Sequence, residues 1–253
     1  MNLLDAISGY PAPALAVMII GLILASLARG YSGFGFSALL ISSWALVTDP
    51  AKAVVLALML EVTASVFQAA SVWKDIPWKR VGLLMAGAVI GTPAGVYVLA
   101  QTDPDVLRLG IAGFVLISAL ALMSGFKLKA KSHPSSTAAV GVASGVCNGA
   151  VAMGGLPVAL FLTADGDDPR VIRAAIIAYF FLLDLIGLGF LGHQGLVSFD
   201  IFQMAILSLP VLLIGMYLGQ RHFLGATPEG FRRVTLILLI TLSALGIIRA
   251  FMG

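Results

Sequence analysis

The sequence predicts an all-α polytopic membrane protein made of two four-segment repeats. Hydrophobic residues make up 60% of the 253 positions and charged residues only 11%, whereas about a quarter of the residues of a soluble domain are charged. Because a helix needs roughly 20 apolar residues to cross a bilayer, the chain has material for about eight such segments. Little of the chain is left for a soluble domain.

The apolar segments fall into two sets of four. The first set lies within residues 1–126, at about 12–48, 51–72, 80–101 and 105–125. The second set lies within residues 137–253, at about 137–163, 171–192, 200–221 and 231–251. Between the sets lies a basic linker, residues 127–136, within the only sizeable polar connection inside the chain. We therefore divide the chain into an N-terminal and a C-terminal repeat at this linker.

The first segment of each set is interrupted by glycines. The stretch 12–48 is too long for one simple span, and RGYSGFGF (29–36) places three glycines inside it. The corresponding interruption in the second set is NGAVAMGGLP (148–157). Glycine destabilises a helix interior by about 1 kcal/mol, and unwound backbone at membrane depth must line a cavity or be buried in protein. We predict that both segments are broken or re-enter the membrane.

The third and fourth segments of each set show the repeat in the sequence. Gly91 and Gly95 in IGTPAG correspond to Gly215 and Gly219 in LIGMYLG, 124 positions later. TDPDVLRLGIAGFVLISALALM, which follows the first pair, resembles ATPEGFRRVTLILLITLSALGI, which follows the second. Chance similarity between helices rich in glycine and leucine is the alternative, but the order and spacing of the matches favour a repeat.

The loop charges favour halves of opposite orientation. The connection after the second segment carries Lys74, Lys79 and Arg80, while its counterpart, residues 194–201, carries neither Lys nor Arg. The bias reverses in the connections after the third and seventh segments. Since Lys and Arg prefer the cytoplasmic side of a membrane, corresponding loops are predicted to face opposite sides, as in an inverted repeat. Parallel halves are the alternative.

The two glycine stretches are the predicted substrate site. Backbone amides at the ends of half-helices suit an anion, and the guanidinium fork of Arg29 matches tetrahedral oxyanions. The alternatives are tight helix packing through small residues and an arginine that only reaches to the membrane interface. The candidate substrate-binding residues are Arg29, Tyr31, Ser32, Gly33, Phe34, Gly35, Asn148, Gly149, Met153, Gly154 and Gly155.

Glu61 and Asp184 are the candidate coupling or gating residues. Each lies inside an apolar segment, at nearly corresponding places in the two sets, and a carboxylate at the bilayer centre costs roughly 2.5–3.5 kcal/mol. Two carboxylates would repel an anion unless they were protonated or paired, so a gating role fits them better than substrate coordination. The alternative is a structural pairing with a backbone donor or with Arg29.

Other classes of chemistry find little support in the sequence. The single cysteine, Cys147, excludes an intramolecular disulfide, and no His/Cys cluster has the spacing of metal ligands. No nucleophile elbow, zincin, P-loop or dinucleotide motif occurs in a suitable context. The net charge of +3 comes mainly from loop residues. We therefore expect no enzyme activity, cofactor, metal or nucleic-acid partner.

The paired features resemble the TauE/SafE family of bacterial sulfite and organosulfur anion exporters. The resemblance covers about residues 12–251 and rests on GYSGFGF and GAVAMGGLP, each of which opens a four-segment half, and on the GxxxG-bearing segments followed by Leu-rich closing helices. It implies a multi-pass protein of the bacterial cytoplasmic (inner) membrane. The implied substrate is sulfite, sulfoacetate or a similar organosulfonate, usually moved outward.

From these features we expect a secondary transporter that works by alternating access in the lipid bilayer. Its partners would be a small anion and, if transport is coupled, protons or another ion; an oligomer is left open. The alternatives are a passive anion channel, which needs no coupling carboxylate, and a membrane assembly subunit that transports nothing.

Overall fold

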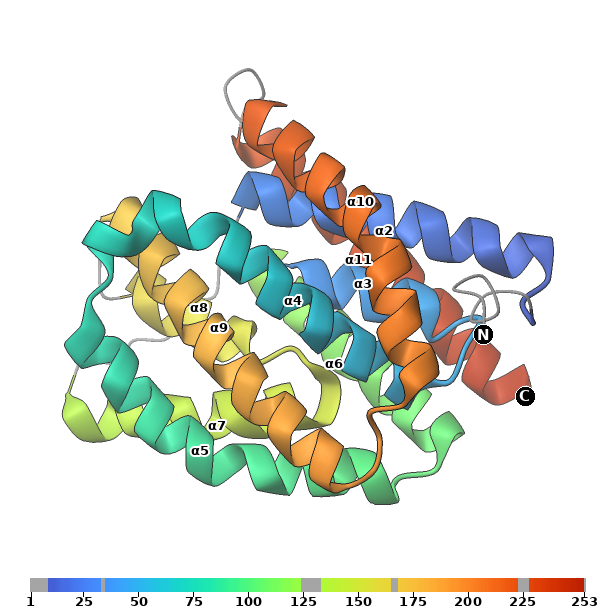
Figure 1. Cartoon of the computed structure of the whole chain (residues 1–253), viewed down its shortest axis with the longest axis horizontal. Coiled ribbons are helices and arrows are strands. Elements are labelled where there is room, and N and C mark those ends of the chain that lie inside the picture. Colours follow the sequence, from blue (N-terminus) through green and yellow to red (C-terminus); the bar gives the residue numbers. More distant parts are fainter. Residues whose placement is uncertain (1–8, 33–34, 124–132, 165–167, 223–227, 253) are drawn as a thin grey trace.

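The computed structural model describes residues 9–32, 35–123, 133–164, 168–222 and 228–252, and they form helices joined by short connections (Figure 1). The N-terminal set contains α2 (Ala12–Ser32), α3 (Phe36–Trp44), α4 (Pro50–Val72), the 3-10 turn η1 (Trp73–Asp75), α5 (Trp78–Gln101) and α6 (Pro104–Met123). The C-terminal set contains α7 (Pro134–Val151), α8 (Gly155–Ala164), α9 (Pro169–His193), α10 (Phe199–His222) and α11 (Pro228–Met252).

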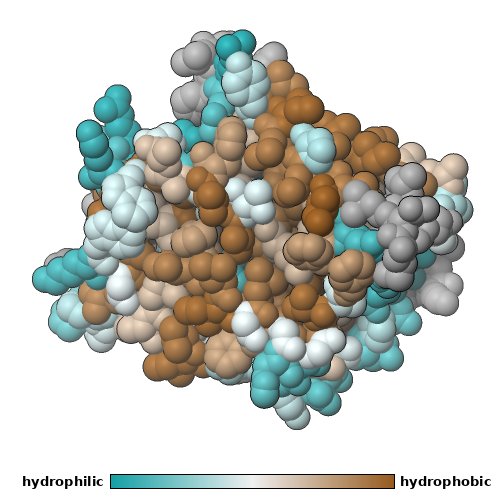
Figure 2. All heavy atoms as spheres, in the orientation of Figure 1, coloured by the Kyte–Doolittle hydropathy of each residue, from teal (hydrophilic) through white to brown (hydrophobic). Residues whose placement is uncertain are grey.

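The helix lengths confirm the all-α polytopic fold. Within the described ranges, six helices are long and apolar enough to cross a membrane, namely α2, α4, α5, α6, α9 and α10. Large apolar side chains such as Ile90 (72% exposed) and Ile117 (70% exposed) face outward from them. Figure 2 shows hydrophobic residues over the middle of one face and hydrophilic residues mainly at its edges. Such an apolar outer surface is typical of a protein embedded in a lipid bilayer.

Both glycine-interrupted segments are broken into two helices, as predicted. The first break separates α2 from α3, and its Gly35 has a φ of +86°, a left-handed conformation that glycine adopts without a steric penalty. The second break separates α7 from α8, with Ala152 at φ 52° closing α7. Each long apolar stretch therefore supplies a long helix and a short helix, not one continuous span.

Proline and a preceding polar residue fix the starts of several helices. The side chain of Asp49 accepts hydrogen bonds from the Ala51 and Lys52 amides at the start of α4, and Asp168 caps α9 through the Arg170 amide. In each case a proline occupies the first helical position, where its missing N–H costs nothing. His133 caps α7, so this helix begins at Pro134, inside the predicted linker 127–136.

Two helix pairs approach so closely that glycine is needed where their backbones meet. A Cβ atom added to any facing glycine would overlap backbone atoms of the other helix. In the α5–α7 pair these glycines are Gly87, Gly91, Gly95, Gly141, Gly145 and Gly149. In the α2–α10 pair they are Gly30 and Gly219. In both pairs, the first helix of one sequence half packs against the third segment of the other half.

Helices α4 and α9 cross the middle of the molecule and run in opposite directions (Figure 1). Leu58, early in α4, lies beside Gly187, late in α9. Val72, at the end of α4, packs with Ala174 and Ile177 near the start of α9. The centres of these two helices carry the predicted carboxylates, so the antiparallel pair forms the scaffold of the candidate site.

Candidate functional site

Arg29 and Glu61 form an ion pair in the interior of the bundle. Arg29 Nη1 lies 3.0 Å from Glu61 Oε2, and the relative exposure of the two residues is 0% and 4%. Glu61 is the twelfth of the 23 residues of α4, which places it at mid-helix. Removing two charges from water costs several kcal/mol per ion unless each is compensated. The structure therefore shows the pairing with Arg29 that the sequence left as an alternative for the carboxylates.

Three further side chains surround this ion pair. Arg29 Nη2 donates to Ser65 Oγ at 2.9 Å, and Ser37 Oγ donates to Glu61 Oε1 at 2.8 Å. The guanidinium carbon lies 5.6 Å from the centroid of the Phe180 ring, within cation–π range. Because these residues come from α2, α3, α4 and α9, the ion pair ties the first helix break to the central helix pair.

A second polar cluster ties the other helix break to α9. Asn148 Nδ2 donates to Asp184 Oδ1 at 2.9 Å, and Asn148 Oδ1 accepts from the Gly154 amide at 3.3 Å. Ser144 Oγ donates to the Gly154 carbonyl at 2.5 Å and accepts from the Tyr179 hydroxyl at 2.8 Å. Asn148 thus fixes the unwound backbone between α7 and α8 and holds Asp184 at the same time.

The two clusters adjoin one another at the α4–α9 contact. The ring of Phe180, which stacks on Arg29, also fills the space beside Gly155, where a Cβ would collide with it. Asp184 is 1% exposed and lies within electrostatic range of both Glu61 and Arg29. Its Oδ2 has no hydrogen-bond partner in the described part of the chain. The site therefore contains one guanidinium, two carboxylates and two helix breaks in a water-poor interior.

Several predicted substrate residues are found in this site, and others have packing roles. Gly154 and Gly155 adjoin the polar clusters. Met153 belongs to the apolar core. Gly149 contacts the backbone of α5 at Thr92, so its close approach serves helix packing.

The remaining predicted residues belong to the first break. Tyr31 is buried, and its amide is next to Gly219 in α10. Gly35 has open space around it, so its left-handed backbone, not crowding, explains the glycine. Gly33 and Phe34 lie outside the described residues, as does the side chain of Ser32.

Sequence reasoning missed four residues that hold the site together: Ser65, Ser144, Tyr179 and Phe180. Helical spacing offered a signal for three of them. Ser65 lies four residues after Glu61, Phe180 four before Asp184, and Ser144 four before Asn148. Residues at this spacing share one face of a helix. No comparable signal pointed to Tyr179, whose partner is on another helix.

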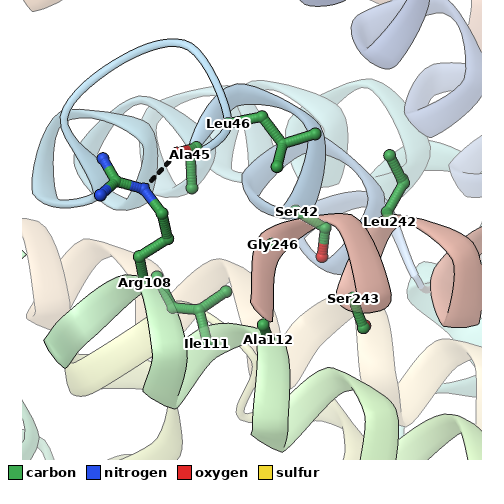
Figure 3. A pocket seen from close by; sticks show the side chains of 9 residues that line it. All are labelled: Ser42, Ala45, Leu46, Arg108, Ile111, Ala112, Leu242, Ser243 and Gly246. Atoms are coloured by element: carbon green, nitrogen blue, oxygen red, sulfur yellow. Dashed lines mark hydrogen bonds between the residues drawn. The ribbon is translucent and has the colours of Figure 1, made fainter. Parts of the chain in front are cut away.

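A separate pocket lies between α3, α6 and α11 (Figure 3). Its wall is mainly apolar, and its cavity volume is only about 10 Å³. Arg108 at its edge donates from Nε to the Ala45 carbonyl at 2.7 Å. None of the predicted site residues lines this pocket, and its arginine is held by the backbone of α3's C-terminal cap. Within the described ranges, no three His, Cys, Asp or Glu side chains gather as metal ligands would.

The comparisons with known proteins identify the family. No curated protein and no solved structure gives a significant match to the chain. The family model described as "Sulfite exporter TauE/SafE" matches residues 17–246, which include both helix breaks, the Arg29–Glu61 pair and the Asn148–Asp184 pair. The implied family function is the export of an anion, and a buried guanidinium between helix breaks is chemically suited to that. The chain belongs to the TauE/SafE sulfite exporter family.

Proposed function

We propose that this protein is a secondary transporter that moves sulfite, sulfoacetate or a similar organosulfonate across the cytoplasmic membrane of a bacterium. The observation that carries the proposal is the fully buried Arg29, which lies beside the first helix break and contacts the central α4–α9 pair. Charged side chains at membrane depth mark substrate or ion pathways. Membership of the family supports an anionic substrate.

Arg29 is the proposed substrate ligand. Its guanidinium presents donors in a fixed fork that matches the oxygens of sulfite or a sulfonate. In the structure, Glu61 and Ser65 hold this fork. An anion that approaches Arg29 must therefore replace the carboxylate as its counter-charge. Asn148, Gly154 and Gly155 face the same region from the second break and are the proposed second wall of the site.

Glu61 is the proposed proton carrier, and Asp184 assists it. When Glu61 takes up a proton, Arg29 loses its counter-charge, and a substrate anion restores it. The net charge of the site is the same before and after this exchange if the anion carries one charge, so the exchange avoids the cost of an uncompensated buried ion. Proton binding and anion binding would then be coupled through one ion pair.

We further propose that the two halves are inverted repeats, and that the α4–α9 contact between them changes during alternating access. Arg29 and Asn148 are 119 positions apart, and so are their hydrogen-bond partners Ser65 and Asp184. Each pair joins the first helix of a half to the second long helix of that half. The antiparallel course of α4 and α9 supports a two-fold axis in the membrane plane, the arrangement of inverted-repeat transporters.

Counterflow in proteoliposomes tests the transport proposal. Purified protein would be reconstituted with unlabelled anion inside, and labelled sulfite, sulfoacetate, taurine, sulfate and simple carboxylates would be offered outside. We expect exchange of sulfite or an organosulfonate and little exchange of carboxylates. If the protein remains folded and no anion in this panel exchanges, the transporter proposal is wrong.

Substitution of the two carboxylates tests the coupling. We expect Glu61→Gln and Asp184→Asn to abolish proton-driven flux and to spare anion exchange, because an amide cannot carry the proton. Flux would be measured with and without an imposed pH gradient. Asp200→Asn, which neutralises an exposed carboxylate at the start of α10, is the matched control and should leave gradient dependence unchanged. Wild-type flux that does not depend on the pH gradient would favour the passive channel.

A further inference from the structure

Gln68 in α4 is a buried polar residue that the proposed site does not use. Its side chain is part of a residue that is 1% exposed, and neither Nε2 nor Oε1 has a hydrogen-bond partner among the described residues. Burying an amide without hydrogen-bond partners is unfavourable. Such a group in a native interior is suited to bind a polar ligand.

Gln68 lies between the ion pair and one end of α4. Glu61, Ser65 and Gln68 are spaced four and three residues apart, so they share one face of the helix. With a rise of 1.5 Å per residue, Gln68 lies about 10 Å along the axis from Glu61 and about 6 Å from the end of α4 at Val72. This face therefore forms a polar file from the ion pair toward loop 73–77.

Arg173 occupies the matching part of α9. Arg173, Phe180 and Asp184 share one face of α9 by their spacing, and the antiparallel packing brings Ala174 against Val72, one turn beyond Gln68. Arg173 is half-buried, its Nε has no hydrogen-bond partner in the described ranges, and its charge interacts with that of Arg29. By this register, Arg173 lies level with the end of α4, farther from the Arg29–Glu61 pair than Gln68 is.

We propose that Gln68 and Arg173 form a second anion-binding position. Through it, sulfite or an organosulfonate reaches Arg29 from the side of the membrane on which loop 73–77 lies. The inference rests on the proposed transport function and adds the route to it. Arg29 is already paired with Glu61, whereas Arg173 Nε has no hydrogen-bond partner among the described residues, so Arg173 is placed to hold an incoming anion before Arg29 does. The amide of Gln68 then offers hydrogen bonds between the two cations. Basic residues at positions 74, 79 and 80 mark this side as cytoplasmic.

Chemical labelling tests the route without any assay of transport. Cys147→Ala removes the only native cysteine, and Gln68→Cys then places a thiol on the proposed route. The probe is sulfonatoethyl methanethiosulfonate, an impermeant anion, applied to right-side-out and inside-out vesicles. We expect modification only from the side of loop 73–77, and slower modification when sulfoacetate is present. Leu60→Cys, a fully buried position in the apolar core of the same helix, is the matched control and should stay unmodified.

The charge preference of this labelling tests the role of Arg173. We expect the anionic reagent to react faster than its cationic aminoethyl analogue, and Arg173→Gln to reduce that preference by about tenfold, since one nearby charge is removed. Arg170→Gln neutralises an exposed arginine one turn earlier and should not change it. Failure of the anion to modify Gln68→Cys from either side, or an unchanged preference in Arg173→Gln, would overturn the inference.

Transport kinetics measured separately from each side of the membrane distinguishes this inference from the proposed function. In oriented proteoliposomes, Arg173→Gln and Gln68→Leu should raise the KM for sulfite about tenfold on the side of loop 73–77 and leave the opposite side unchanged, because only one approach is altered. Arg173→Lys should restore most of the loss. Wild-type protein without sulfite exchange would refute the proposed function. Active wild-type protein with unchanged KM values in both variants would refute only the route.

Discussion

At the residue scale, the buried Arg29–Glu61 pair is not explained by its contribution to folding stability alone. A buried ion pair loses solvation that its attraction only partly returns, and apolar replacements of similar volume are often as stable. Yet both groups are placed at membrane depth with hydroxyl partners on two further residues, Ser65 and Ser37. This arrangement is more readily explained by a charge that changes partner than by one that only holds helices together.

Removing one member of the pair and removing both should affect stability differently. Arg29→Met alone leaves Glu61 buried without its counter-charge, and we expect it to lower the free energy of unfolding by about 3–5 kcal/mol. Arg29→Met combined with Glu61→Met should recover most of the melting temperature, measured in one detergent. Anion exchange should be lost in both variants. A double variant that is no more stable than Arg29→Met, or that still exchanges sulfite, would contradict the proposed role of the pair.

The sequence located the charged members of the site because a charge inside an apolar segment is conspicuous. Arg29, Glu61 and Asp184 were found in this way, but their pairing depends on which helices adjoin, and spacing within one helix says nothing about that. Tyr179 shows the limit most clearly. It looks like an ordinary aromatic residue in a membrane helix, and only the packing of α9 against α7 brings its hydroxyl to Ser144.

At the element scale, glycine has two different uses in this chain. At Gly35 it permits a left-handed backbone in open space. At Gly149 and along α5 it permits two helices to touch backbone to backbone. The sequence predicted both helix breaks from glycine clusters and placed Gly149 among the candidate substrate residues, and the structure adds a close packing contact for this glycine. A missing Cβ serves unwinding and close packing equally well, so the sequence alone does not separate the two.

The close packing of α5 and α7 predicts a sharp contrast between two glycines of one helix. In Gly91→Ala the new methyl group would collide with the Val142 carbonyl, whereas in Gly82→Ala it would enter open space. We expect Gly91→Ala to lower the melting temperature and Gly82→Ala to leave it unchanged or raise it, because alanine favours a helix over glycine by about 1 kcal/mol. Thermal unfolding in detergent would check this. Equal melting temperatures would argue against the interlocked pair.

At the scale of the whole molecule, the two halves are interlocked. The α5–α7 and α2–α10 contacts each join one half to the other through backbone contact at glycines. Such contacts resist sliding because each carbonyl fits a space without a Cβ. The α4–α9 contact, in contrast, is made through side chains, such as Leu58 beside Gly187 and Val72 beside Ala174. We therefore expect the transport movement to change the α4–α9 contact and to keep the two glycine-packed pairs intact.

The antiparallel course of α4 and α9 predicts opposite exposure of their following loops. In a Cys147→Ala background, Lys79→Cys and Gln194→Cys each place a thiol at an exposed position beyond one of these helices. We expect an impermeant thiol reagent to label the first from the cytoplasmic side and the second from the other side. Labelling of both positions from the same side would contradict the inverted arrangement and favour parallel halves.

The glycine packing of α2 against α10 also has a consequence in time. The ribosome adds about 5–20 residues per second, so Glu61 follows Arg29 within a few seconds, whereas Phe199, the start of α10, follows Ser32 only after roughly 10–30 s. The charge of Arg29 thus gains its counter-ion early in synthesis. The glycine surface of α2, however, has no α10 to pack against until most of the chain has been made. During synthesis, the Arg29–Glu61 pair can therefore form early, whereas the α2–α10 contact forms only after most of the chain has been made.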